Sequence, residues 1–411
     1  MRTSPPRHDP TQSENSQVSH VDAKPPLLPR APRFTWNANH AICPLTAKPS
    51  AMSLASFDFI IVGQGLAGTA LAWSLLWSGS RVLVIDRNSP VTSSKIAAGL
   101  ITPITGQRLV KTWRFDELWP AAVAFYRRVE QETGTSLFRQ SPMVRLFSNG
   151  NEVDFFARRI AASEFREMTR QPEPLLDPSW FVSEHGGFEM PSAGQLDVPQ
   201  YLTASREHFG REGCYLTIDL DAEHDLELDS LGVSLPRFGV RAGRLIFCQG
   251  IDATSNAWFR TVRFKPAKGE ILIVRIPGLS ENRVVHRGVW LAPLGGELFR
   301  VGSTYEWQQL DNVPTAAGRD EILSRLREFL LLPFEVVEHQ AAVRPIHLNQ
   351  YPVVGLHPDY EQLGYFNGLG SKGTLHAPYF ASHFVRVLSG EVALDPEVDL
   401  NRKTDLLGCR P

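Results

Sequence analysis

The sequence predicts an α/β fold that opens with a strand-turn-helix-strand unit and continues into a sheet-rich second lobe. An apolar run at residues 57–62 precedes a G-x-G-x-x-G pattern at residues 63–68, and a second apolar run at residues 81–86 ends in an acid. Runs typical of strands recur between residues 226 and 302. With 411 residues, 43% of them hydrophobic, the chain can bury a large core divided into two lobes.

The glycine pattern at residues 63–68 has the spacing of a phosphate-binding turn. Gly63 allows a tight turn, Gly65 allows a pyrophosphate to approach the backbone, and Gly68 allows the helix to pack against the strand. Leu66 and Ala67 open the helix, whose free N–H groups and dipole favour phosphate. The pattern therefore predicts a dinucleotide ligand.

The acid at the end of the second strand completes this interpretation. Asp86 lies near the spacing at which a carboxylate accepts hydrogen bonds from the ribose hydroxyls of a dinucleotide. We assign its neighbour Arg87, and Gly250 after the strand-like residues 244–248, to the same cofactor site.

Composition excludes several other classes of protein. A formal net charge of -2 and a pI near 6.6 give no general electrostatic reason to bind nucleic acid. The four cysteines, Cys43, Cys214, Cys248 and Cys409, form no C-x-x-C pair, so we predict neither a disulfide framework nor a metal site. No apolar run is long enough for a transmembrane helix, and no charged-then-apolar leader of the kind that marks secretion is expected. A cytoplasmic location is expected.

The first residues differ from the rest of the chain. Residues 1–52 are rich in proline and polar residues and have no periodic apolar face, and we predict a disordered extension over residues 1–55.

Helix and strand signals continue along the chain. Asp116 is expected to cap a helix that ends at Thr133 before Gly134, and Asp197 is expected to cap a helix that contains Pro199 and ends near Gly210. Further helices are predicted over residues 152–168, 317–331 and 374–388, and strands over residues 226–235, 244–248, 269–274, 289–292 and 298–302. Pro378 is expected to fall close to the first turn of its helix.

Two more segments are rich in small residues. Residues 92–103 contain few bulky side chains, which suggests that something lies against their backbone. A late glycine turn at residues 367–373 opens the helix predicted over residues 374–388.

These segments, in this order, resemble the D-amino acid oxidase and glycine oxidase family of FAD-dependent enzymes. The resemblance spans residues 57–388 and is carried by the first glycine turn, by Ser94-Lys95-Ile96-Ala97-Ala98-Gly99-Leu100, by Ala342-Val343-Arg344-Pro345 and by Gly370-Ser371-Lys372-Gly373 with Ala377-Pro378. It implies FAD as cofactor. It also implies a doubly wound, Rossmann-like FAD-binding domain of the glutathione-reductase type, assembled from residues 56–105, 190–262 and 340–411, and a substrate domain on a large mixed β-sheet from residues 106–189 and 263–339.

The resemblance also implies roles for single residues. Ser94, Ala97, Ala98, Gly99 and Leu100 would lie beside the pyrophosphate and the isoalloxazine ring, and Gly370, Ser371, Lys372, Gly373 and Thr374 would bring a helix N-terminus to the flavin. Arg344 would clamp the substrate carboxylate, and Lys372 would neutralise reduced flavin or reach the substrate. The alternatives are an Arg344 that only ties down a loop and a Lys372 that is an ordinary exposed lysine.

Several nearby side chains have no settled role. Tyr305 and Trp307 either wall the substrate pocket or simply pack beside a sheet. Lys111 and Arg108 either recognise a second acidic group or face water. His286, His347 and His376 are expected to be structural, because hydride transfer to flavin needs no imidazole.

The predicted activity is oxidation of the C–N bond of an amino acid or N-substituted amino acid, with hydride transfer to FAD and hydrolysis of the imine. Oxygen or another acceptor would reoxidise the flavin. The alternatives are a quinone-linked amino acid dehydrogenase, a flavin-binding protein without turnover, and an enzyme similar to the oxidase half of the bifunctional enzyme that completes the wobble uridine of tRNA. The substrate, its handedness and the oligomeric state do not follow from the sequence.

Overall fold

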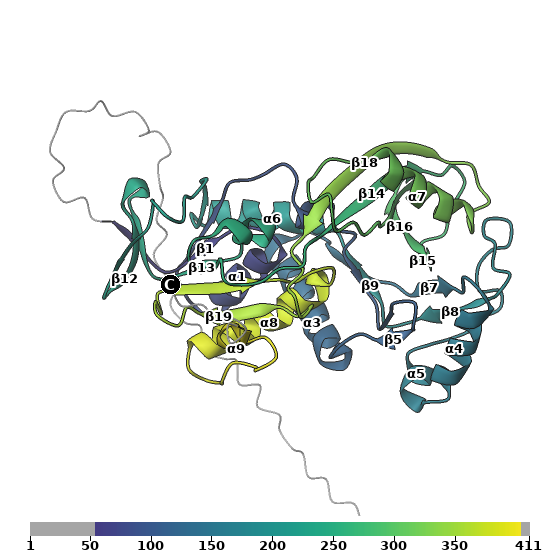
Figure 1. Cartoon of the computed structure of the whole chain (residues 1–411), viewed down its shortest axis with the longest axis horizontal. Coiled ribbons are helices and arrows are strands. Elements are labelled where there is room, and N and C mark those ends of the chain that lie inside the picture. The colour runs from purple at the N-terminus through teal and green to yellow at the C-terminus, as the bar shows by residue number, and fades with distance from the viewer. Residues whose placement is uncertain (1–53, 404–411) are drawn as a thin grey trace, which may run out of the picture. The chain divides into compact units, whose positions relative to one another are not determined.

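The computed structural model of the protein describes residues 54–403 (Figure 1). The predicted disordered extension lies outside these residues, except for its last two, and Ala55 already begins the first strand. The predicted βαβ unit is present as β1 (Ala55–Val62), α1 (Leu66–Trp77) and β2 (Val82–Asp86). The α/β fold class is confirmed.

The first sheet has eight strands and a parallel centre. Parallel pairing runs from β10 (Tyr215–Thr217) through β2 and β1 to β13 (Val240–Phe247) and β20 (Leu363–Asn367). β19 (Val353–Leu356) pairs antiparallel with β20, and the hairpin of β11 (Glu227–Asp229) and β12 (Gly232–Leu235) pairs with the start of β13. The parallel strands all end at the same edge, which is where ligands bind in open α/β sheets.

Both faces of this sheet are buried, and the alternation of side chains shows how. Ile61 packs in a cluster with α1, α3 (Phe115–Thr133), α6 (Val198–Arg211) and α8 (Gly373–Leu388). Ile60 and Val62 point to the opposite face, where Phe259 and Leu400 belong to their cluster. A strand covered on both faces has to be apolar at successive positions, as residues 59–62 of β1 are.

The second sheet has seven strands in the order β18-β14-β17-β16-β15-β7-β8. These strands are β7 (Met143–Leu146), β8 (Gly187–Met190), β14 (Ala267–Arg275), β15 (Val284–Arg287), β16 (Val289–Gly295), β17 (Leu298–Gly302) and β18 (Glu335–Arg344). One face packs on α7 (Ala316–Arg327) through Leu272, Val274 and Leu326 (Figure 1). Because α7 covers that face, alternate residues of the strands must point to the other side.

Small elements complete the described chain. They are a three-stranded sheet of β3 (Leu100–Ile101), β9 (Gly194–Leu196) and β6 (Phe138–Gln140), a pair of β4 (Ile104–Thr105) and β5 (Val110–Lys111), the helices α2 (Ser93–Ile96), α4 (Gly150–Ile160), α5 (Ser163–Glu167) and α9 (Leu400–Lys403), and two 3₁₀ turns, η1 (Pro236–Phe238) and η2 (Gly250–Ser255).

The expected N-cap of α3 was wrong. Arg114, in a left-handed conformation with φ 51°, occupies the cap position, and the helix already includes Asp116. The Asp116 carboxylate instead accepts a hydrogen bond from Lys111 Nζ at 2.6 Å, and Arg114 binds Glu117 and Asp395. The Asp116 side chain is therefore used in an ion pair, and no side chain of the cap residue closes this helix. The predicted end at Thr133, with Gly134 left-handed after it, is confirmed.

Other boundaries differ from the predictions by a turn or a hairpin. The helix expected over residues 152–168 is divided into α4, capped by the Asn149 side chain, and α5. The strand expected over residues 226–235 is a hairpin, β11 and β12, and the helix expected over residues 317–331 is α7, which ends four residues earlier at Arg327. The Asp197 cap is confirmed, because its side chain accepts a hydrogen bond from the Gln200 N–H at 3.1 Å.

Pro378 lies deeper in its helix than expected, and a tyrosine compensates for it. α8 begins at Gly373, so Pro378 belongs to the second turn, where its missing N–H leaves the carbonyl of Thr374 without its helical donor. The buried Tyr126 hydroxyl of α3 donates to that oxygen at 2.7 Å. The Tyr126 side chain thus replaces the missing backbone hydrogen bond of α8 and links α3 to α8.

The two predicted domains stay a prediction. The strands of the first sheet fall in the segments that we assign to the cofactor domain, and β18 crosses the boundary between the two assignments. No helix within residues 54–403 has both the length and the apolar character that a membrane span requires.

Candidate active site

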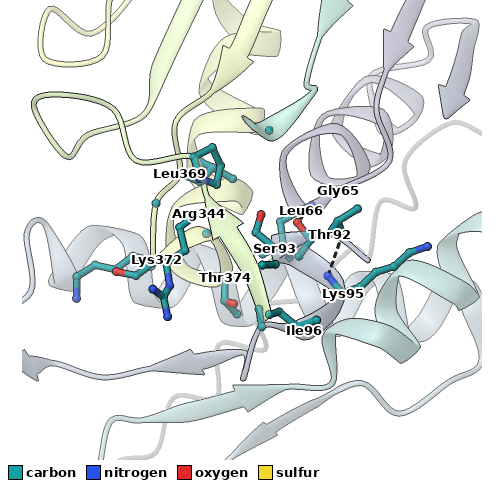
Figure 2. A pocket seen from close by; sticks show the side chains of 18 of the residues that line it. Gly65, Leu66, Thr92, Ser93, Lys95, Ile96, Arg344, Leu369, Lys372 and Thr374 are labelled. Carbon is teal, nitrogen blue, oxygen red and sulfur yellow. Dashed lines mark hydrogen bonds between the residues drawn. The ribbon is translucent and has the colours of Figure 1, made fainter. Parts of the chain in front are cut away.

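A cavity of about 500 Å³ lies where the ends of the parallel strands meet the second sheet. Its lining includes the residues after β1, β2, β13 and β20, and side chains from one face of β14, β15 and β18. Figure 2 shows Gly65, Thr92 and Lys95 at one side of this pocket and Arg344 and Lys372 at the other. Its volume is within the range of about 300–1,000 Å³ typical of ligand sites.

The first glycine turn has no room for side chains. Gly63 adopts φ +102°, and a Cβ there would lie 2.5 Å from the Cys248 carbonyl oxygen. A Cβ on Gly68 would collide with the Gly63 carbonyl oxygen. Gly63 lines the cavity, whereas Gly68 does not and serves the close packing of α1 on the turn. Steric exclusion therefore explains both glycines.

The start of α1 opens on the cavity. Gly65, Leu66 and Ala67 all line it, and no side chain of the cap residue Gly65 closes the helix. Ser94 Oγ accepts a hydrogen bond from the Leu66 N–H at 3.1 Å, which ties the small-residue segment to this helix end. The remaining first-turn N–H groups have no partner within the helix and provide an anion site.

Asp86 is held at the cavity wall by main-chain groups. Its two carboxylate oxygens accept hydrogen bonds from the N–H of Gln64 at 2.7 Å and the N–H of Asn88 at 2.6 Å. Arg87 and Gly250 also line the cavity, and Arg87 forms an ion pair of 2.6 Å with Asp252. The Asp86 carboxylate thus has a fixed orientation.

The small-residue segment is anchored from behind. The buried Arg300 guanidinium donates to the Ala97 carbonyl oxygen at 2.7 Å, and the Leu196 N–H donates to the Gly99 oxygen at 2.9 Å. Gly99 has φ +71°, and a Cβ there would collide with the Leu196 carbonyl. Ala97, Ala98, Gly99 and Leu100 consequently line the cavity with backbone and small side chains.

The late glycine turn brings a second open helix end to the cavity. Gly370, Ser371, Lys372, Gly373 and Thr374 line it, and no side chain caps the N-terminus of α8. Burial lowers the pKa of Lys372 to about 8, and its Nζ lies 3.4 Å from Thr105 Oγ1. The alternative of an ordinary exposed lysine is not supported.

Arg344 lies in the cavity without an acidic partner among the described residues. Its guanidinium donates to Ser303 Oγ at 2.8 Å and to the Thr304 carbonyl oxygen at 3.2 Å, and it lies 4.3 Å from the centre of the Tyr305 ring. Burial lowers its pKa, and the one further electrostatic influence is Tyr305. Neutral groups thus orient the guanidinium and leave its charge for a ligand.

Several lining residues were not predicted. Gly269, which pairs with Ala342, lies directly under Arg344, because a Cβ on it would collide with the guanidinium. The same side of the second sheet also brings Met143, Arg145, Ile271, His286 and Trp290 to the cavity. The signal available in the sequence was the two-residue strand period, but nothing in it said which face α7 covers.

Two of these lining residues, Arg145 and His286, differ in charge. Arg145 is buried and its NH2 lies 3.2 Å from Glu152 Oε1, so its charge is compensated. Burial, reinforced by Arg145, lowers the pKa of His286 to about 3. His286 is therefore a neutral lining group at ordinary pH.

Two basic residues considered for a second acidic group are not part of the cavity lining. Lys111 binds Asp116 at 2.6 Å and Glu164 at 2.5 Å, and Arg108 does not line the cavity either. Tyr305 lines the cavity, and Trp307 lines a smaller pocket beside it.

The family model described as FAD dependent oxidoreductase matches residues 58–386. The chain belongs to this family. The resemblance stated from the sequence is confirmed, and FAD is the cofactor of the family.

Individual relatives are distant. "Uncharacterized oxidoreductase YurR" of Bacillus subtilis is 23% identical, over 84% of this chain and 97% of that protein. The tRNA 5-methylaminomethyl-2-thiouridine biosynthesis bifunctional protein MnmC of Marinobacter nauticus is 24% identical over 83% of this chain, which spans 57% of that protein. The crystal structure of glycine oxidase from Geobacillus kaustophilus has a TM-score of 0.73 at 21% identity and covers 85% of this chain and 99% of that chain. This structural likeness shows the shared fold.

The residues at the cavity fit an FAD molecule. Two helix N-termini without side-chain caps, those of α1 and α8, open on one cavity, and neither has an acid in its first turn to repel an anion. Asp86 supplies a fixed acceptor at the same sheet edge. These groups suit a molecule with a pyrophosphate, a ribose and a ring that becomes negative on reduction.

Proposed function

We propose that the protein oxidises the C–N bond of an amino acid or an N-substituted amino acid. The observation that carries this proposal is the Arg344 guanidinium, which lies in the cofactor cavity and has no carboxylate partner within the described chain. A guanidinium binds a carboxylate with two parallel charge-assisted hydrogen bonds and so fixes its orientation. The likeness to a glycine oxidase structure supports the same substrate class.

The chain's own residues would bind and orient the substrate. The chemistry that FAD supplies when bound is a two-electron oxidation by hydride acceptance. Ser303, the Thr304 carbonyl and Tyr305 hold Arg344 in place, and Ile271 and Trp290 give the cavity an apolar wall that excludes water. At neutral pH a mostly protonated Lys372 would balance negative charge at the N-terminus of α8.

We further propose individual roles for the lining residues. Gly63, Gly65, Leu66, Ala67, Asp86, Arg87, Gly250 and the segment from Ser94 to Leu100 would contact the adenosine and pyrophosphate side, with Gly68 acting through packing. Gly370, Ser371, Lys372, Gly373 and Thr374 would contact the flavin ring. We expect a cytoplasmic location, in keeping with the buried free thiols of Cys214 and Cys248.

An anaerobic screen tests the proposal. The purified, flavin-loaded protein is mixed with amino acids of both hands and with N-methyl amino acids, and bleaching of the flavin absorbance is recorded. Bleaching by at least one of these acids is expected. A yellow protein that no amino or imino acid bleaches would contradict the proposal and favour a flavin-binding protein without turnover.

The electron acceptor is decided in the same assay. With a substrate that bleaches the flavin, oxygen consumption is compared with the reduction of a quinone analogue. Oxygen consumption with this substrate would assign an oxidase. Turnover with the quinone analogue alone would instead assign a quinone-linked dehydrogenase.

A second candidate function is oxidation of a glycine-like group on tRNA. The observation that favours it is the 24% identity to a tRNA-modifying bifunctional protein. Filter binding of bulk tRNA at low and moderate salt tests it, because phosphate contacts give an affinity that falls steeply with salt. Absence of binding at low salt would exclude this candidate.

A further inference from the structure

A second, smaller pocket of about 270 Å³ adjoins the main cavity. Both are lined by Tyr305, Leu369, Gly370, Ser371 and Lys372, so the two spaces share a wall that reaches to Arg344. Its other lining residues are Lys265, Trp307, Ile346, His347, Gln350 and His376. The complete lining of the second pocket contains two lysines, Lys265 and Lys372, and no acid.

The positive charge of this pocket is not compensated from within the described chain. Among the lysines of residues 54–403, Lys111 and Lys268 form ion pairs with carboxylates. Lys265, which is exposed, and Lys372, at the N-terminus of α8, form none. An anion entering the pocket would therefore meet two free ammonium groups.

His376 provides an independent sign of a ligand. Its side chain is 3% exposed, and neither ring nitrogen has a hydrogen-bond partner within residues 54–403. The ring packs edge-on against Trp113 and Phe380 and lines the second pocket. Burial, with a contribution from Lys372, lowers the pKa of His376 to about 3. A neutral imidazole with a free N–H can donate to an anion, and a buried polar group without any partner is costly.

The outer wall of the pocket is aromatic. Tyr305 and Trp307 are 43% and 55% exposed, and their ring centres are 6.0 Å apart. Exposed aromatic side chains beside a basic pocket provide a surface for the carbon chain that would join two polar groups.

We propose that the second pocket is a subsite for a second carboxylate of the substrate, so that the preferred substrates are amino or imino acids with two carboxylates. This inference rests on the proposed function. Arg344 binds the carboxylate next to the reacting carbon, Tyr305 and Trp307 flank the connecting chain, and Lys265 and His376 bind the distal carboxylate.

The first test measures binding without turnover. Glutarate, succinate and butyrate are titrated into the flavin-loaded protein, and Kd is obtained from the shift of the visible flavin spectrum. The dicarboxylates are expected to bind at least about tenfold more tightly than butyrate, the factor of one added charge-assisted hydrogen bond. The Lys265→Gln variant should lose this advantage and keep the affinity for butyrate.

Arg263→Gln is the matched control for Lys265→Gln. Arg263 is an exposed residue two positions away, lines neither pocket and carries the same charge. It is expected to leave both affinities unchanged. An equal loss of dicarboxylate affinity in both variants would reduce the effect to general electrostatics and overturn the subsite.

The second test uses reactive pairs of nearly equal shape. Anaerobic flavin reduction is compared for aspartate against asparagine and for glutamate against glutamine, in both hands. At least one acid should exceed its amide about tenfold in kcat/KM, and His376→Leu should remove this preference while His376→Gln, which keeps a donor, retains part of it.

The outcomes separate the two proposals. If amides and acids reduce the flavin equally, the subsite is wrong and the proposed function stands. If neither class reduces it, the proposed function itself fails. Inorganic phosphate that binds with Lys265-dependent affinity and does not compete with the dicarboxylates would also overturn the assignment, because the pocket would then hold a free oxyanion.

Discussion

The two sides of the cavity are built in different ways. At the edge of the first sheet the lining consists largely of main chain, fixed by glycines whose neighbours are backbone oxygens, as at Gly63 and Gly99. On the face of the second sheet the lining consists of side chains, such as Arg344, Ile271 and Trp290, set by strand register. A binding site built from main chain is therefore determined by a short sequence motif. A binding site built from side chains depends on the pairing of strands that are far apart in the sequence.

The largest expected effect would break the main-chain side. Gly63→Ala places a Cβ against the Cys248 carbonyl at a left-handed φ, and we expect the fold to lose more than about 4 kcal/mol and to retain no flavin. Gly79→Ala is the control: Gly79 has φ +84° but nothing within 4 Å, so the cost should be about 1–2 kcal/mol. Urea unfolding and the ratio of flavin to protein absorbance measure both. Equal losses of unfolding free energy in the two variants would show that the left-handed φ alone, and not the contact with the Cys248 carbonyl, causes the effect.

The second largest expected effect concerns Arg344, on the side of the cavity that is lined by side chains. Arg344→Ala should cost about 2–5 kcal/mol of transition-state binding, a loss in kcat/KM of about 30-fold to several-thousand-fold. Flavin content should stay normal. Arg344→Lys keeps the charge but not the planar fork and should recover little of the loss. Unchanged kinetics in Arg344→Ala would leave the arginine only its loop contacts to Ser303 and Thr304.

Gly269→Ala tests the strand register without replacing the arginine itself. The added Cβ overlaps the guanidinium of Arg344, which must move, and a displacement of about 1 Å can cost about 10²-fold in rate. We expect a loss in kcat/KM of about tenfold to a hundredfold at normal flavin content. Gly243→Ala, in a strand of the first sheet where a Cβ would be 3.3 Å from the Asp58 oxygen, is the control and should leave kcat/KM unchanged.

Lys372 sharpens the comparison because its charge depends on pH. With a pKa of about 8, it loses its proton as pH rises through that value, and carboxylate affinity should fall up to about tenfold between about pH 7 and 9. The Lys372→Arg variant stays charged and should show a flat profile in the same flavin titration. Stability has the opposite sign: above about pH 8 the unfolded lysine binds more protons, so the free energy of unfolding rises with pH up to about 10.4. If the carboxylate affinity of the unaltered protein did not change with pH, the protonation assigned to Lys372 would be contradicted.

The smallest expected effect concerns the helix behind the late glycine turn. Tyr126→Phe removes the donor to the Thr374 carbonyl and should lower the free energy of unfolding by about 1–3 kcal/mol without loss of flavin. Tyr201→Phe is matched, because the Tyr201 hydroxyl is buried without a partner within residues 54–403, and it should cost close to nothing. A reversed order of the two variants in urea unfolding would refute the account of Pro378.

This contrast also explains what the sequence could predict. The spacing of Gly63, Gly65, Gly68 and Asp86 is local, so the first βαβ unit was predicted with its boundaries nearly correct. Arg344 was found through family resemblance, and its role stays a prediction. Gly269 was missed, since only the pairing of β14 with β18 places it under the guanidinium.

Local signals also failed where ion pairs, near or far along the chain, involve the same side chains. Asp116 has the composition of a cap, but Lys111 takes its carboxylate, and Arg114, held by Asp395 far along the chain, sets the start of α3. The helix predicted over residues 152–168 is divided into α4 and α5. Contacts between residues hundreds of positions apart are not encoded in any single window of sequence.

The two main-chain donors on Asp86 have a kinetic consequence. Because Gln64 and Asn88 already hold both carboxylate oxygens, the acid is locked in one rotamer by the folding of the turn itself. If Asp86 binds the cofactor as proposed, binding carries no entropic penalty for freezing this side chain. The association rate at the Asp86 end of the cavity should accordingly be governed by diffusion and by the path into the cavity, and not by rearrangement of this side chain.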